Sequence, residues 1–162
     1  MHKIPTISYN DLKNTNKEVL EFLTLSLENN GFFVINNHPI DLKLISNAFQ
    51  IAEEMFDLPF ETKQKYHVPG TNGARGYTPY GIETALNEKV ADQKEFWHQG
   101  STTNAELMSN IYVNEIDNFK DLDTLYKEFE MMGVEILKAF ANFKIPYNTD
   151  ISDSAQNGNS IL

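Results

Sequence analysis

Apolar residues recur every three or four positions in three stretches of the chain, which is the spacing of an amphipathic helix. The first helix is predicted at residues 16–29 and the second at about residues 42–57. The third starts after Asp117 or Asn118 and runs to about residue 142, and its apolar face is expected to pack in a core. The apolar faces consist of Val19, Phe22, Leu23 and Leu27 in the first helix, of Leu42, Ile45, Phe49, Ala52 and Phe56 in the second, and of Phe119, Leu122, Phe129, Ile136 and Phe140 in the third, widened by Leu125, Met132 and Leu137.

Residues at the ends of these stretches are typical of helix boundaries. Thr15 and Glu18 fit a capping box at the start of the first helix, because a hydroxyl and a carboxylate can satisfy free N–H groups there. Gly31 suits a left-handed cap at its end. Asp41 is a good N-cap for the second helix, and Pro146 is expected to stop the third.

Short strands are predicted between the helices. Residues 4–9 alternate apolar with other residues, and Pro5 would confine this strand to a sheet edge. Residues 32–36 form an apolar, partly β-branched run that indicates a buried strand. A short polar helix is expected at residues 60–66, and a weak strand signal lies at residues 111–113. The fold class predicted is therefore α+β, with amphipathic helices packed on a few strands.

Residues 74–100 form the most informative passage. They contain the only arginine, Arg75, and the only tryptophan, Trp97, together with three glycines, one proline and four aromatic residues. Glycine and proline favour loops and turns, and an aromatic loop with one cation can form a wall for a small anionic substrate. The alternative is a surface loop without function.

Composition limits the class of protein. The 162 residues favour one domain, and 41% apolar with 22% charged residues is ordinary for a soluble globular protein. The net charge of −10 argues against binding nucleic acid or anionic lipid. The absence of cysteine excludes disulfides and thiolate metal sites. No apolar run has the length of a membrane span or signal core, so a cytoplasmic location is expected.

Two motifs in the informative passage resemble a known family. Residues 75–81 read RGYTPYG and residues 92–100 read DQKEFWHQG. They are similar to the paired motifs Arg-Gly-Tyr-x-Pro-x-Gly-x-Glu and Asp-x-Lys-Glu-x-Phe/Trp-x-x-Gly in the N-terminal region of the isopenicillin N synthase-like oxygenases. These enzymes use non-haem iron(II) and 2-oxoglutarate. The segments Gly-Phe-Phe, Asn-His, Phe-x-Leu-Pro and Lys-x-Lys-Tyr of that region also occur here in order, although Pro39 stands where the family usually has glycine.

The resemblance implies a division of the chain and a missing catalytic part. Residues 1–147 would be the N-terminal domain, and residues 148–162 the linker to, and start of, a double-stranded β-helix (jelly-roll) core. In the family that core supplies a His-x-Asp pair, a distant His and an Arg-x-Ser motif, and none of these occurs in this sequence. We therefore assign no catalytic and no metal-binding residue, and expect this chain alone to bind neither Fe(II) nor 2-oxoglutarate. The expected partner is the jelly-roll half, in cis or as a separate chain.

Three residues of the loop are candidates for substrate binding: Arg75, Tyr77 and Tyr80. Arg75 could clamp a carboxylate through its planar guanidinium, or could form a structural salt bridge. The two tyrosines could flank a small-molecule substrate, or could simply pack. His98 could be a metal ligand, but a histidine with a satisfied hydrogen bond is the favoured interpretation because one histidine makes no metal site.

Two acidic residues of the same passage need a separate interpretation. Asp92 and Glu95 are expected to be solvated or paired with Lys94 and Lys89 rather than to act in acid–base catalysis.

Two functions remain open at this point. The first is the N-terminal part of an oxygenase that hydroxylates, desaturates or cyclises a small molecule, as a truncated product or one piece of a split enzyme. The second is a stand-alone, non-catalytic binding module whose exposed apolar face binds a protein partner. Helices without their expected cover predict marginal stability and a tendency to associate.

Overall fold

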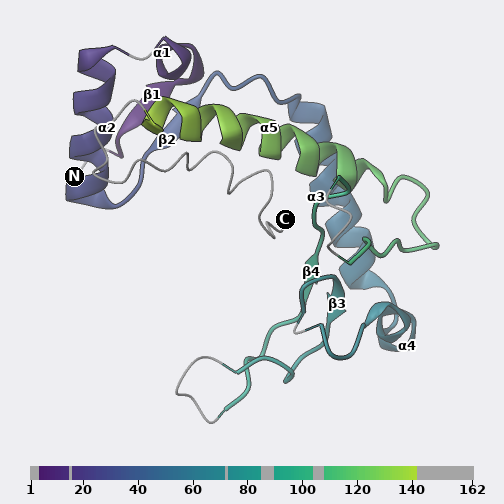
Figure 1. Cartoon of the computed structure of the whole chain (residues 1–162). Coiled ribbons are helices and arrows are strands. Elements are labelled where there is room, and N and C mark those ends of the chain that lie inside the picture. The colour runs from purple at the N-terminus through teal and green to yellow at the C-terminus, as the bar shows by residue number, and fades with distance from the viewer. Residues whose placement is uncertain (1–3, 15, 72, 85–89, 104–107, 142–162) are drawn as a thin grey trace. The chain divides into compact units, whose positions relative to one another are not determined.

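The computed structural model describes residues 4–14, 16–71, 73–84, 90–103 and 108–141 (Figure 1). These residues form helices and a few short strands, which is consistent with the predicted α+β class. They fall into two compact units. The first contains residues up to Ile40 and those from Phe129 onward, and the second contains Asp41–Glu128.

The first unit is built around a two-stranded parallel sheet. Strand β1 pairs with β2 in the register Thr6 to Val34, Ile7 to Ile35 and Ser8 to Asn36. Its elements are β1 (Thr6–Ser8), α1 (Tyr9–Lys13), α2 (Lys17–Asn30), β2 (Val34–Asn36) and the C-terminal part of α5 (Asp121–Ala141).

One face of this sheet is buried and the other is not. Ile7 packs in a cluster with Leu12, Leu23 and Ala139. On the opposite face Phe32 is 52% exposed and Val34 is 43% exposed. The prediction of a buried strand at residues 32–36 is therefore wrong for Phe32, Val34 and Asn36, because the described residues cover only one side of the sheet.

The caps of the helices follow the sequence closely. Helix α2 begins after Asn16, whose side chain accepts a hydrogen bond from the Val19 N–H at 3.0 Å. The predicted capping box of Thr15 and Glu18 is therefore wrong, because Asn16 occupies the N-cap position, and Thr15 itself lies outside the described residues. Gly31 ends α2 with a φ of 77°, as predicted for a left-handed cap. Asp41 caps the next helix by accepting from the Lys43 N–H at 2.9 Å, also as predicted.

The second unit holds the loop that the sequence singled out. Its core contains Ile51 and Met55 from α3 together with Tyr66, Tyr77 and residues on either side of Phe119. Its elements are α3 (Leu42–Asp57), α4 (Phe60–Lys63), the 3-10 turn η1 (Gln64–Tyr66), β3 (Gly76–Thr78), β4 (Phe96–His98) and the N-terminal part of α5.

Two predictions near α5 need correction. Residues 111–113 form no strand and instead contribute the buried side chain of Val113 to the core. Helix α5 starts at Asp121, two or three residues later than a cap at Asn118 or Asp117 predicts. Residues 117–120 are turns, in which Asn118 O accepts from the Asp121 N–H at 2.9 Å.

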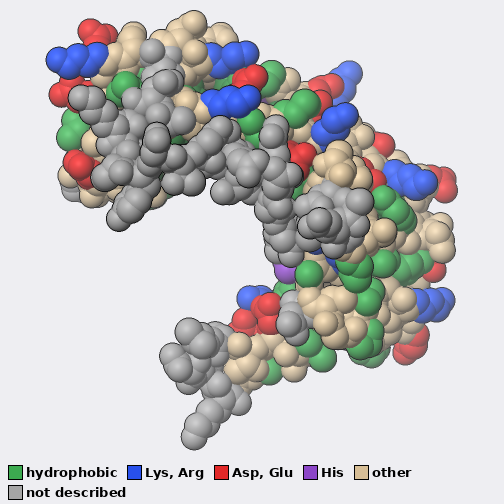
Figure 2. All heavy atoms as spheres, viewed as in Figure 1, with side chains coloured by type: hydrophobic (Ala, Val, Ile, Leu, Met, Phe, Trp, Pro, Cys, Tyr) green, Lys and Arg blue, Asp and Glu red, His purple; other side chains and the backbone are tan. Residues whose placement is uncertain are grey.

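The apolar faces of the helices are only partly covered. Leu42 and Phe49 on α3 are 71% and 74% exposed, and hydrophobic side chains are visible at the surface in Figure 2. Phe129 on α5 is also exposed, contrary to its predicted place in a core, whereas Leu122 and Leu125 are buried as predicted. Within the described residues, no helix combines the length and the apolar character needed to cross a bilayer.

Predictions for the end of the chain are not tested. The stop at Pro146, the boundary between residues 147 and 148, and the start of a jelly-roll core within residues 148–162 all lie outside the described residues.

Candidate functional site

The two motifs of the central passage form the two strands of one antiparallel hairpin (Figure 1). Gly76 pairs with His98, and Tyr77 pairs with Trp97. Because side chains alternate along a strand, Tyr77 and Trp97 share the face that packs on the core of the second unit. The hairpin therefore places the candidate residues from both motifs around one small sheet.

Arg75 is enclosed by this hairpin. Its side chain is 1% exposed, and Nη1 donates to the carbonyl oxygen of Ala74 at 2.6 Å. The guanidinium lies against Gly100, where an added Cβ would be 2.0 Å from Arg75 Cζ. Only glycine at position 100 leaves room for the guanidinium in this place.

Tyr77 is also enclosed, and its hydroxyl donates to the Glu95 carboxylate. Glu95 in turn binds Lys63, whose Nζ lies 3.0 Å from Oε1 and 2.9 Å from Oε2. Lys63 Nζ donates as well to the carbonyl oxygen of Phe56 at 2.8 Å. A buried ammonium, carboxylate and phenol thus form one chain of hydrogen bonds. Glu95 was expected to be solvated or paired with Lys94 or Lys89. Its partner is instead Lys63, and Lys89 lies outside the described residues.

This arrangement shifts two pKa values. Burial raises the pKa of Tyr77, and the hydrogen bond to Glu95 raises it further. Burial alone would raise the pKa of the Glu95 carboxyl, but the hydrogen bonds from Tyr77 and Lys63 outweigh it and hold that pKa below its usual range. Glu95 is therefore an ionised structural anchor.

Tyr80 differs from the other two candidates because it is 55% exposed. It follows β3 at a point where Gly81 N–H donates to the carbonyl oxygen of Asp92 at 3.1 Å. Asp92 forms an ion pair with Lys94 at 2.9 Å, as the sequence suggested. Of the three residues proposed for substrate binding, only Tyr80 offers an exposed ring.

A second polar cluster, centred on Asp123 at the start of α5, was not predicted. Gln99 Nε2 and Asn110 Nδ2 donate to Asp123 Oδ1 at 2.5 and 2.9 Å, and the Tyr112 hydroxyl donates to Oδ2 at 2.7 Å. Asn110 also exchanges two hydrogen bonds of 2.8 Å with the backbone of Gly100. Burial, the hydrogen bond to Asp123 and its charge raise the pKa of Tyr112 to about 12. The cluster fixes the backbone that lies against Arg75.

The described residues do not fit an iron(II) site. No group of three or more histidine, aspartate or glutamate residues among them could hold a metal ion. His67 Nδ1 lies 3.0 Å from the carbonyl oxygen of Tyr77, and His98 Nδ1 is bound to the carbonyl oxygen of Gly73. Each of these histidines has a backbone partner, as the favoured interpretation of His98 required.

Comparison with known proteins assigns this geometry to a family. Residues 4–116 match the family described as non-haem dioxygenase in morphine synthesis N-terminal. The match includes both strands of the hairpin, the Lys63–Glu95–Tyr77 chain and Arg75 with Gly100.

Individual relatives agree with this match. The 2-oxoglutarate-dependent dioxygenase ucsF of Acremonium sp is 24% identical over 134 residues, covering 75% of this chain and 40% of that protein. The 1-aminocyclopropane-1-carboxylate oxidase of Dictyostelium mucoroides is 28% identical over 139 residues, covering 82% and 36%. The matched part of this chain therefore covers less than half the length of these relatives.

A solved structure shares the fold. A crystal structure assigned to the 2OG-Fe(II) oxygenase family, from Caulobacter crescentus, is similar with a TM-score of 0.72 and 33% sequence identity. The similarity covers 88% of this chain and 49% of that chain.

Proposed function

Because the chain belongs to the family of non-haem dioxygenase N-terminal regions, we propose that it supplies that region to an Fe(II) and 2-oxoglutarate-dependent oxygenase acting on a small molecule. The observation that carries this proposal is the family match over residues 4–116, which includes both strands of the hairpin. The names of similar proteins, a 2-oxoglutarate-dependent dioxygenase and a 2OG-Fe(II) oxygenase family member, support the choice of co-substrate and metal.

The proposal places the metal ligands in another part of the enzyme. The described residues hold no suitable cluster, and the sequence has no His-x-Asp or Arg-x-Ser motif. We propose that a jelly-roll part, joined in cis or supplied as a separate chain, carries them, with residues 1–147 as the N-terminal domain and 148–162 leading into that part. Bound iron and 2-oxoglutarate would supply oxygen activation for hydroxylation, desaturation or ring formation.

Within such an enzyme the hairpin would line the substrate side. Tyr80 would contact the substrate directly, since its ring is exposed. Arg75 and Tyr77 would position the hairpin without touching the substrate, because both are 1% exposed and make contacts within the protein. If Arg75 were to bind a substrate carboxylate, its guanidinium would have to move away from its position against Gly100.

The test is complementation. The full chain is mixed anaerobically with Fe(II), alone and with a purified jelly-roll polypeptide taken from the Caulobacter crescentus relative, and bound iron is measured. 2-Oxoglutarate and oxygen are then added, and the succinate formed is measured. We expect no stoichiometric iron on the chain alone, and faster succinate formation by the mixture than by the jelly-roll polypeptide alone.

Two results would contradict the proposal. Tight one-to-one Fe(II) binding by the chain alone would show that it has its own ligand set. A mixture that forms a complex but turns over 2-oxoglutarate no faster than the jelly-roll polypeptide would show that the chain contributes nothing to the oxygenase. The variant Tyr80→Ala serves as a control, since it should leave complex formation and uncoupled succinate formation intact.

A further inference from the structure

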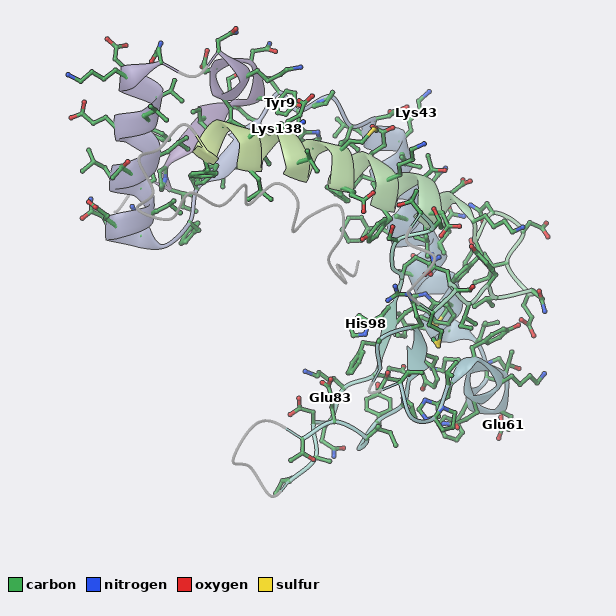
Figure 3. The ribbon with its side chains drawn as sticks, in the orientation of Figure 1. Tyr9, Lys43, Glu61, Glu83, His98 and Lys138 are labelled. Atoms are coloured by element: carbon green, nitrogen blue, oxygen red, sulfur yellow. The ribbon has the colours of Figure 1, made fainter. Side chains whose placement is uncertain are left out.

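The outer face of the β3–β4 hairpin carries a second arrangement of functional groups. Phe96 and His98 lie on the side of β4 opposite Trp97, which packs against the core, because side chains alternate along a strand. Both rings are partly exposed. Their centroids are 4.9 Å apart, and Figure 3 shows the His98 side chain projecting sideways from β4. An aromatic ring and an imidazole thus stand side by side on a partly open surface.

The hydrogen bond of His98 determines which ring nitrogen carries the proton. Nδ1 is bound to the carbonyl oxygen of Gly73, and a carbonyl oxygen can only accept. The neutral imidazole therefore carries its proton on Nδ1 and a lone pair on Nε2. His98 is an oriented hydrogen-bond acceptor.

Gly73 is needed for this orientation. Its φ is +73°, and an added Cβ would lie 2.9 Å from Thr78 Oγ1 and 3.3 Å from Phe96 Cε2. Glycine lets the loop press onto the outer face and bring its carbonyl oxygen to His98.

Thr78 adds a second polar atom to the same face. It pairs with Phe96 across the hairpin and is 1% exposed. Within the described part of the chain its Oγ1 has no hydrogen-bond partner. A buried hydroxyl without a partner is costly, so a polar ligand atom that reached it would be favoured.

We propose that this outer face binds a small planar molecule with an N–H donor, of the cyclic amide class. Its ring would lie against Phe96, and its N–H would donate to His98 Nε2. A flat ring suits the aromatic contact, and an acceptor that is held in place selects for a donor and rejects analogues without one. Binding of such a molecule to this face does not depend on the proposed function. Only a role of the face in substrate recognition rests on that function.

The probes are 2-pyridone and N-methyl-2-pyridone, which differ by the N–H donor. The full chain is labelled with ¹⁵N, and the imidazole nitrogens are followed by NMR during titration with each compound. We expect His98 in the Nδ1–H form and a shift of its Nε2 signal when 2-pyridone is added. 2-Pyridone should bind roughly 3- to 10-fold more tightly than the N-methyl compound, which is the range expected for one neutral hydrogen bond.

Variants separate the two contacts. His98→Asn keeps an N–H donor near the position of Nδ1, so it can still bind the Gly73 carbonyl oxygen. It has no acceptor at the position of Nε2, because its amide oxygen is closer to the backbone, and it should bind both pyridones equally. Phe96→Leu should weaken both compounds alike. The control is His67→Asn, because His67 has the same bond from Nδ1 to a backbone oxygen, that of Tyr77 at 3.0 Å, and this change should leave the preference intact. Amide spectra verify that each variant is folded.

The inference is overturned by an Nε2–H form of His98, or by equal binding of the two pyridones to the unchanged protein. Its failure is distinct from failure of the proposed function. Pyridone selectivity without succinate formation in the complementation test refutes the oxygenase role alone, and succinate formation without pyridone selectivity refutes this site alone.

Discussion

At the residue scale, the guanidinium of Arg75 lies directly against the backbone of Gly100. A Cβ at position 100 would lie 2.0 Å from Arg75 Cζ and 2.1 Å from Nη2. We predict that Gly100→Ala lowers the free energy of unfolding by roughly 1–3 kcal/mol, because the guanidinium must leave its enclosed position. Urea unfolding of the full chain measures this.

The matched control for that change is Gly133→Ala in α5. Nothing lies within 4 Å of a Cβ added there. Alanine should therefore raise the free energy of unfolding by roughly 0.5–1 kcal/mol, since glycine is a poor helix former. If both alanine variants were equally stable, Arg75 would not lie against Gly100.

Glu95 gives a prediction for pH. Folding lowers the pKa of the Glu95 carboxyl below its ordinary value of 4.5. The carboxylate therefore stabilises the fold above pH 4.5, and this stabilisation is lost as the pH falls through the lower folded pKa. We predict that Glu95→Gln costs roughly 1–3 kcal/mol at pH 7 because it leaves Lys63 without its anion. Its difference from the unchanged protein should shrink as the pH falls below 4.5, as measured by urea unfolding across a pH series.

Glu83→Gln is the companion measurement for Glu95. Glu83 pairs with Lys94 at 3.6 Å, and both side chains are about half exposed. The loss should stay below about 0.5 kcal/mol, because solvent and salt screen such pairs. Equal losses for the two variants would argue against a structural role of the Lys63–Glu95 pair.

At the scale of elements, helix α3 begins at a cap that can be tested separately. Asp41 accepts from the Lys43 N–H at 2.9 Å. We predict that Asp41→Ala lowers the free energy of unfolding by roughly 1 kcal/mol, whereas Asp41→Asn has little effect because asparagine caps almost as well. Thermal unfolding followed by circular dichroism distinguishes them, and a large loss with asparagine would mean that charge rather than capping is responsible.

Helices were more predictable than strands because their signals are local. The bounds of α3 match the prediction, and Gly31 ends α2 as expected. Burial of the strand at residues 32–36 depends on what covers the sheet, and residues 111–113 found no strand partner among the described residues. Neither condition is contained in a short stretch of sequence.

The candidate site was predictable only as a loop. The motifs indicated that residues 75–81 and 92–100 act together, and they form one hairpin. The partners of individual side chains could not be predicted, because Lys63 and Glu95 are 32 positions apart and Gln99 and Asp123 are 24 apart. No periodic pattern reports on contacts of that separation.

At the scale of the whole molecule, charge and exposed apolar surface act in opposite directions. The net charge of −10 keeps molecules apart. Exposed apolar side chains favour association, and they occur in both units, on Phe32 at 52% exposure and on Leu42 at 71%. Association should therefore increase with salt, because salt screens the repulsion but not the apolar contact.

Phe49 allows that balance to be tested. It is 74% exposed on α3, whereas Met55 on the same helix is 2% exposed. We predict that Phe49→Gln reduces self-association of the full chain and leaves the free energy of unfolding within about 0.5 kcal/mol of the original, since an exposed ring contributes little to the fold. Met55→Gln should instead lower the free energy of unfolding by more than about 2 kcal/mol, because it places an amide in the core.

Light scattering over a concentration and salt series measures self-association, and urea unfolding of each variant measures stability. If the unchanged chain stays monomeric at high salt, its exposed apolar side chains are too dispersed to act as an association surface. If Phe49→Gln also destabilises the fold, the ring is part of the core.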